Sequence, residues 1–126
     1  MEKQIINTSG APAPIGPYNQ AMRVGDFLFV SGQIPIDPAT GELVQSGIQD
    51  ETEKVMQNLA AILKEAGMDF SNVVKSSIFL TDMKQFALVN EVYAKYFTEN
   101  APARETVQVA ALPKFVNVEI SVIAAK

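Results

Sequence analysis

The sequence predicts a single α+β domain in which two helices cover one face of a mixed β-sheet. Two segments carry apolar residues at helical spacing, and the segments around them alternate apolar with polar residues, as half-buried strands do. The expected order is strand, hairpin, helix, strand, helix, strand, strand. Because strand–helix–strand connections share one handedness, both helices should lie on the same face of the sheet.

Length and composition agree with one domain over residues 1–126. The chain is 48% hydrophobic and 19% charged, and no repeat or change of composition marks a second domain. No run approaches the roughly 18 apolar residues that a membrane helix needs. The N-terminus also lacks the basic-then-apolar profile of a signal peptide. We therefore expect a cytoplasmic protein without a membrane partner.

The sequence contains neither Cys nor His. This composition excludes thiol nucleophiles and histidine-based triads, and it argues against the usual metal sites. Any proton transfer falls to Glu, Asp, Lys, Tyr or water. The net charge of −4, with Lys and Arg scattered along the chain, argues against a nucleic-acid partner.

The N-terminal third is expected to form strands. Residues 3–7 are a short strand at an edge, and residues 9–17 form a stiff loop rich in proline and glycine. The segments 19–24 and 27–31 alternate and flank a Gly-Asp pair. This pattern predicts a β-hairpin in which the glycine takes a positive φ.

The first helix is expected to start after Ser46 and to stop at Gly67. Ser46 and Gln49 have the spacing of a capping box, and glycine is a common residue just beyond a helix C-terminus. The helix should bury a stripe made of Ile48, Thr52, Val55, Met56, Leu59, Ile62, Leu63 and Ala66.

A strand over residues 73–80 leads to the second helix. Asp82 and Gln85 repeat the capping pattern, and the helix is expected to end near Asn100. Its apolar stripe comprises Phe86, Val89, Tyr93, Tyr96 and Phe97.

The last quarter of the chain predicts two strands that each carry one charge. Arg104, Thr106 and Gln108 point to one side of the first strand, and Glu119 lies on the polar side of the second. If the two polar sides coincide, a guanidinium and a carboxylate share one surface on rigid backbone. Such an arrangement suits a small-molecule site. The alternative is a structural ion pair on the sheet.

The sheet face without helices is expected to bind another copy of the chain. It should carry Phe79, Ile123 and either Phe27 or Phe29 among polar residues. Apolar patches of this kind on small proteins usually meet another chain. We therefore expect an oligomer that packs sheet against sheet.

Three further positions each allow two interpretations. Tyr18 is either a hydrogen-bonded packing residue or part of a site. Gly32, directly after a strand, either ends that strand or lets a ligand come close. Asn90, beside the apolar stripe of the second helix, forms a buried or interfacial hydrogen bond by default.

Several short motifs, each weak alone, form a specific combination over the full length of the chain. They are Ile15-Gly16-Pro17-Tyr18, Ser31-Gly32-Gln33-Ile34-Pro35, Phe86 to Tyr93 with Asn90, Pro102-Ala103-Arg104, Leu112-Pro113 and Val118-Glu119-Ile120. Together they resemble the reactive intermediate deaminase A family, also called RidA or YjgF. The resemblance implies a chorismate-mutase-like fold and a homotrimer with sites in clefts between subunits. It also implies hydrolysis of 2-iminobutanoate and 2-iminopropanoate to 2-oxo acids and ammonia, without a metal or cofactor.

The resemblance implies roles for two charged residues. Arg104 would bind the planar carboxylate of a 2-imino acid through two parallel hydrogen bonds, which lysine cannot make. Glu119 would position or activate the attacking water. A nearby arginine would favour the ionised form of Glu119, which a base requires.

The resemblance also implies five neighbours of the substrate. Tyr18, Ser31 and Gly32 would line the cleft, and Asn90 would lie close by across a subunit boundary. The position of Thr106 is often cysteine in the family, so substrate preference is the property that this departure affects.

Two alternatives to the enzyme remain at the level of the sequence. The first is a regulatory module that binds small carboxylates through Arg104 without turning them over. The second is a ribonuclease or translation inhibitor, an activity attributed to some relatives. The acidic balance of the chain and its lack of histidine argue against the second.

Overall fold

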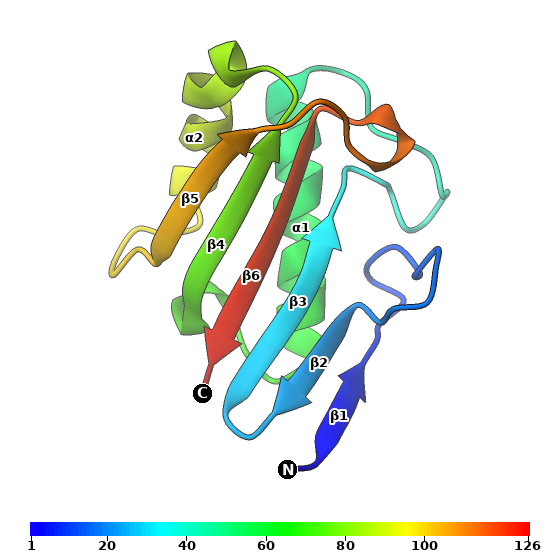
Figure 1. The fold of residues 1–126 in the computed structure, drawn as a ribbon, viewed down its shortest axis with the longest axis vertical. Helices are drawn as coiled ribbons and strands as arrows, with labels where there is room; N and C mark the ends of the chain where they lie inside the picture. The colour runs from blue at the N-terminus through cyan, green and yellow to red at the C-terminus, as the bar shows by residue number, and fades with distance from the viewer.

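The computed structural model describes residues 1–126 as one six-stranded sheet with both helices on the same face (Figure 1). The strand order is β1-β2-β3-β6-β4-β5; all neighbours are antiparallel except β4 and β5, which are parallel. The predicted α+β class and the order of elements are confirmed. The elements are β1 (Lys3–Ile6), β2 (Ala21–Val24), β3 (Phe27–Gln33), α1 (Ile48–Glu65), β4 (Val73–Leu80), α2 (Phe86–Ala94), β5 (Ala103–Gln108) and β6 (Val118–Ala125).

The main core lies between α1 and the sheet. The predicted stripe of α1 is buried except for Ala66, which follows the helix and is partly buried; Val55, Met56 and Leu59 are fully inaccessible to solvent. Each such side chain contributes about 1.5–3 kcal/mol of stability on burial. From the sheet side Leu28 and Ile120 complete this layer. No helix has the length and apolar character needed to cross a membrane.

The capping box expected at the start of α1 is not formed. Gly47 occupies the N-cap with a φ of 123°, and no side chain caps the helix. This backbone conformation places Ser46 one residue outside the cap, where its hydroxyl donates to the Asp50 carboxylate at 2.8 Å. The predicted stop is confirmed, since Gly67 follows the last helical turn with a φ of 75°.

The second helix is shorter than predicted at both ends. Asp82 caps a separate 3₁₀ turn, where its carboxylate accepts from the Lys84 N–H at 3.0 Å, and α2 begins only at Phe86. Beyond Ala94 each backbone N–H bonds to the carbonyl three residues earlier, as in a 3₁₀ turn, so the α-helix ends well before Asn100.

The sheet face opposite the helices, called here the open face, carries apolar side chains among polar ones and is not covered by a helix. Phe27 and Phe29 are 49% and 47% exposed, and the partly exposed Ile123 is the cross-strand neighbour of Phe29. Phe79, also partly exposed, lies farther along this face as the neighbour of Glu119. The predicted apolar patch is thus confirmed.

Candidate active site

Arg104 lies on the edge strand β5 and turns toward α2. Its Nη1 donates to Asn90 Oδ1 at 2.8 Å. The guanidinium carbon is 4.9 Å from the ring centroid of Tyr93 and 5.5 Å from that of Phe86. A hollow of about 350 Å³ opens beside it, lined also by Asn90, Tyr93 and Pro102.

The sequence of α2 explains this arrangement. Phe86, Asn90 and Tyr93 stand four and three residues apart, so they share one helical face and meet the same side chain. The Tyr93 hydroxyl donates to the Ser76 hydroxyl on β4 at 2.9 Å, and Ser76 is fully buried. The aromatic ring under Arg104 is therefore fixed at its far end.

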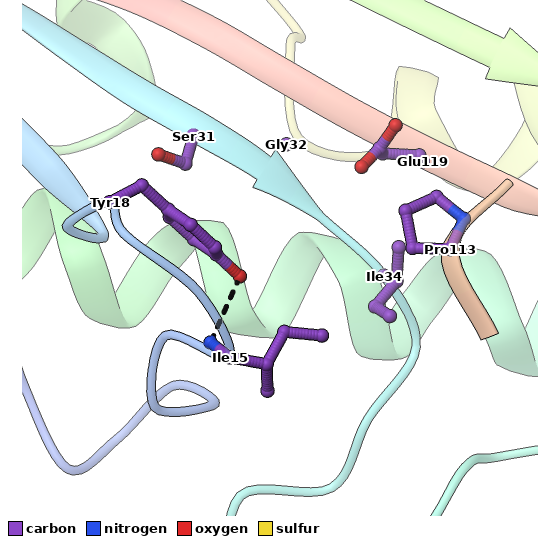
Figure 2. Close-up of a pocket in the computed structure, with 7 residues that line it drawn as sticks. All are labelled: Ile15, Tyr18, Ser31, Gly32, Ile34, Pro113 and Glu119. Atoms are coloured by element: carbon purple, nitrogen blue, oxygen red, sulfur yellow. Dashed lines mark hydrogen bonds between the residues drawn. The ribbon is translucent and has the colours of Figure 1, made fainter.

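Glu119 lies on β6 and faces a second hollow of about 370 Å³ (Figure 2). This hollow combines three apolar side chains with a small number of polar groups, as small-molecule sites do. Its lining is Ile15, Tyr18, Ser31, Gly32, Ile34, Pro113 and Glu119.

A β-bulge brings Gly32 against Glu119. The pairing of β3 with β6 shifts between Val30 and Gln33, so Ser31 and Gly32 form the irregular stretch. Bulges often re-aim side chains next to active sites. A β-carbon placed on Gly32 would lie 2.7 Å from both Cδ and Oε1 of Glu119. Only glycine leaves room for the carboxylate in this position.

Glu119 has no positively charged neighbour within the chain. Neither of the two ion pairs includes it. Burial raises the pKa of the Glu119 carboxyl above its ordinary value. The expectation that a nearby arginine favours its ionised form is therefore wrong for a single chain.

Tyr18 and Ser31 differ in the protons that they can offer. The Tyr18 hydroxyl accepts a hydrogen bond from the Ile15 N–H at 3.3 Å, which leaves its own proton free to donate (Figure 2). The Ser31 hydroxyl donates to the backbone carbonyl of Asn19 at 2.6 Å. In this hollow, therefore, Tyr18 can act as a donor, whereas Ser31 can offer only an acceptor oxygen.

Arg104 and Glu119 lie on opposite faces of the sheet. Arg104 is the cross-strand neighbour of Ser76, which is buried beneath α2, and Glu119 is the neighbour of Phe79 on the open face. The predicted shared surface is therefore wrong for a single chain. The alternative of an ion pair between the two residues is wrong as well.

The site residues predicted from the sequence thus fall into two groups. Asn90 accompanies Arg104, whereas Tyr18, Ser31 and Gly32 accompany Glu119. Thr106 lines neither hollow, although its hydroxyl oxygen is buried without a hydrogen-bond partner. No cluster of acidic side chains is arranged to hold a metal ion.

Sequence reasoning missed the aromatic contacts of Arg104 and the apolar lining around Glu119. Phe86 and Tyr93 were expected only as core residues, yet their spacing from Asn90 would have placed all three on one face. Ile34 and Pro113 carry no comparable signal, because the chain brings them together from distant loops.

Comparisons with known proteins agree with the fold and with the motifs. A family model described as Endoribonuclease L-PSP matches residues 8–126. A RutC family protein of Pyrococcus horikoshii is 53% identical over 124 residues, and the match covers 98% of this chain and 98% of that protein. The 2-iminobutanoate/2-iminopropanoate deaminase of Mus musculus is 48% identical over 97% of this chain and 90% of its own length.

A solved structure extends the agreement to three dimensions. RidA from the Antarctic bacterium Psychrobacter sp. is 45% identical and superposes with a TM-score of 0.94, covering 98% of this chain and 99% of that one. Sequence and fold therefore match over nearly the whole length, and the resemblance drawn from the motifs is confirmed. The chain belongs to the Endoribonuclease L-PSP family, which includes the RidA proteins.

Proposed function

We propose that this protein hydrolyses 2-imino acids, such as 2-iminobutanoate and 2-iminopropanoate, to 2-oxo acids and ammonia. The observation that carries the proposal is a pair of complementary hollows, one presenting the Arg104 guanidinium and the other the Glu119 carboxylate, neither charge being paired within the chain. Relatives that are 47–50% identical bear the name of this deaminase.

The complete site forms between two copies of the chain. Because Arg104 and Glu119 lie on opposite faces of one sheet, a second copy is needed to bring a guanidinium to a Glu119 hollow. The exposed open face with Phe27 and Phe29 supplies apolar surface for such a contact. Two different surfaces that meet in this way form a ring when the rotation between subunits closes, and a homotrimer is the ring that we propose.

In the assembled site Arg104 binds the substrate carboxylate through two parallel hydrogen bonds. This grip fixes the imine carbon relative to a water beside Glu119, and such orientation accounts for a large part of the rate enhancement in many enzymes. The apolar side chains of Ile15, Ile34 and Pro113 accommodate the short alkyl group of the substrate.

Glu119 acts as the general base in this mechanism. It takes a proton from water as the water oxygen bonds to the carbon of the protonated imine, and the π electrons of the C=N bond move to nitrogen and leave a neutral amino group. Glu119 returns this proton to the amino nitrogen, which becomes –NH3+. Glu119 then takes the proton of the new hydroxyl group as the C=O bond forms and the C–N bond breaks, so that ammonia and the 2-oxo acid leave. The Tyr18 hydroxyl can donate its proton in a hydrogen bond to the attacking water oxygen or to the substrate carboxylate, and this bond stabilises negative charge there.

The test is an imine-trapping assay. An amino acid oxidase or a dehydratase generates 2-iminopropanoate, and semicarbazide traps the imine that remains. We expect less trapped imine with the wild-type protein than with buffer, and no difference from buffer with Arg104→Ala. Equal trapping with wild type and buffer would contradict the enzyme and favour a protein that binds small carboxylates without turnover.

A further inference from the structure

Arg104 has no acidic partner, although two glutamates lie close to its contacts in the sequence. Neither of the chain's two ion pairs includes Arg104. Glu105, the next residue on β5, faces the other side of the sheet, where it bonds to Lys75. Glu91, next to Asn90 on α2, accepts from Gln49 instead. The guanidinium is thus left with its full positive charge.

The groups that do hold the guanidinium are all neutral. Asn90 accepts from it through an amide oxygen at 2.8 Å, and the Tyr93 and Phe86 rings lie within 4.9 and 5.5 Å of its central carbon. The Tyr93 ring is itself fixed by the hydrogen bond from its hydroxyl to buried Ser76. We call Phe86, Asn90 and Tyr93 the neutral seat.

A neutral seat has a different consequence from a carboxylate partner. Arginines in proteins are commonly oriented by Asp or Glu, which fix the side chain but also neutralise it. An amide oxygen uses one of the five N–H donors and adds no charge. Aromatic ring faces attract the cation and still leave its N–H groups free at the edge. The orientation of the Arg104 guanidinium is then fixed, while its electrostatic attraction for an anion is not reduced.

We propose that Phe86, Asn90 and Tyr93 are positioning residues that fix the Arg104 guanidinium without neutralising it, so that an incoming carboxylate meets an unpaired and pre-oriented cation. The identity of that carboxylate as the substrate's rests on the proposed function, whereas the seat itself is a property of the free protein. The two are therefore tested separately.

The first measurement concerns the seat in the protein without ligand. The chain has only two arginines, Arg23 and Arg104, so the side-chain NMR spectrum contains two guanidinium signals. Arg23 is bonded to backbone carbonyls and serves as the internal reference. We expect the Arg104 signals to be shifted upfield by the aromatic rings and to show slow rotation about the Nε–Cζ bond. In Tyr93→Leu the upfield shift should largely disappear, and in Tyr93→Phe it should persist.

The second measurement is the affinity for 2-oxobutanoate, the stable carboxylate product of 2-iminobutanoate hydrolysis. Asn90→Asp keeps the size and the acceptor oxygen but adds a negative charge, whereas Asn90→Leu removes the acceptor and stays neutral. We expect Asn90→Asp to weaken binding by at least about tenfold at neutral pH and to be worse than Asn90→Leu. Gln57→Glu, on the exposed side of α1, adds the same charge at a distance and should bind like wild type.

The relative affinities of Asn90→Asp and Asn90→Leu for 2-oxobutanoate show whether the neutrality of Asn90 or its packing matters more. A purely structural role for Asn90 predicts the reverse order, because aspartate preserves the packing better than leucine; that result would overturn the proposal. Arg104 signals without a ring shift in the wild-type spectrum would also overturn it. If the ring shift is present but the wild type binds 2-oxobutanoate without hydrolysing imines, the seat stands and the proposed enzyme does not.

Discussion

Gly32 and Glu119 approach each other so closely that no side chain larger than hydrogen fits between them. A β-carbon on Gly32 would lie 2.7 Å from the Glu119 carboxyl carbon and 2.9 Å from its Cγ. Real β-carbons do not approach other atoms to this distance, so any substitution must displace the carboxylate. The bulge in β3 therefore sets the position of Glu119.

Gly32→Ala is expected to lower imine turnover by at least about tenfold, because a displacement of roughly 1 Å is enough for such a loss in an oriented site. The atoms that clash belong to the end of a flexible side chain, so the substitution should cost no more than is typical of overpacking, about 1–3 kcal/mol, and leave the protein folded. Gly16→Ala is the matched control, since its β-carbon meets the Tyr18 ring at an ordinary 3.5 Å. Unchanged turnover in Gly32→Ala would show that the position of Glu119 does not matter for the reaction.

Arg104→Lys is expected to be nearly as damaging as Arg104→Ala. Lysine keeps the positive charge but loses the planar fork that grips a carboxylate with two parallel hydrogen bonds. It also loses the contact of the guanidinium with the rings of Tyr93 and Phe86. Steady-state kinetics of the three proteins measure the difference. Full activity in the lysine variant would show that the charge alone suffices.

The acid limb of the pH–rate profile is expected above pH 4.5, the ordinary pKa of a glutamate. Burial raises the pKa of Glu119, so a larger fraction of the carboxyl is protonated at a given pH. A general base must be ionised, and kcat/KM therefore falls as the pH drops through this raised pKa. The profile is measured after subtraction of uncatalysed hydrolysis.

Glu119→Gln provides the control for this limb, because it should bind substrate, turn it over slowly and lack the limb altogether. A wild-type limb at or below pH 4.5 would show that a guanidinium from another subunit outweighs the effect of burial on the pKa of Glu119.

Mixing two impaired variants is expected to restore part of the wild-type activity. A chain with Arg104→Ala still carries Glu119, and a chain with Glu119→Gln still carries Arg104. When the two are co-expressed, about a quarter of the sites in a ring combine one intact arginine with one intact glutamate, so activity should reach up to about that fraction of wild type. No recovery in mixed oligomers of confirmed composition would contradict a site formed between subunits.

Phe115→Asn is expected to stabilise the protein. Lys114 and Phe115 both have a positive φ, of 55° and 56°, and Phe115 is 87% exposed, so its ring contributes little packing within the chain. Asparagine adopts this conformation more readily, and the gain is about 0.5–1 kcal/mol of unfolding free energy. Urea denaturation measures it, with Phe115→Leu as the unchanged control. A loss of stability would instead indicate that Phe115 packs against another subunit.

Much of the fold could be predicted because its signals are local. The stripe of α1 and the alternation of β4 and β6 fix which residues are buried, whatever the order of the strands. The start of α1 could not be predicted in the same way. The pattern of Ser46 and Gln49 suits a capping box, but Gly47 takes a φ of 123° and becomes the N-cap itself.

The relation between Arg104 and Glu119 depends on information that no single strand contains. Alternation within a strand gives its two faces, but not which face of one strand continues into another. Here β4 lies between β5 and β6, and the registers of Ser76 with Arg104 and of Phe79 with Glu119 send the two charges to opposite faces. The sequence could name candidate residues, but their distribution over two hollows required coordinates.

The placement of these two charges also ties catalysis to mass action. In the proposed mechanism, a chain on its own would hold two incomplete halves of the site and would be inert toward imines until it met another copy. Dilution below the dissociation constant of the oligomer would then abolish activity without unfolding the protein. The abundance of the chain, and not only the supply of substrate, would set how much chemistry each molecule performs.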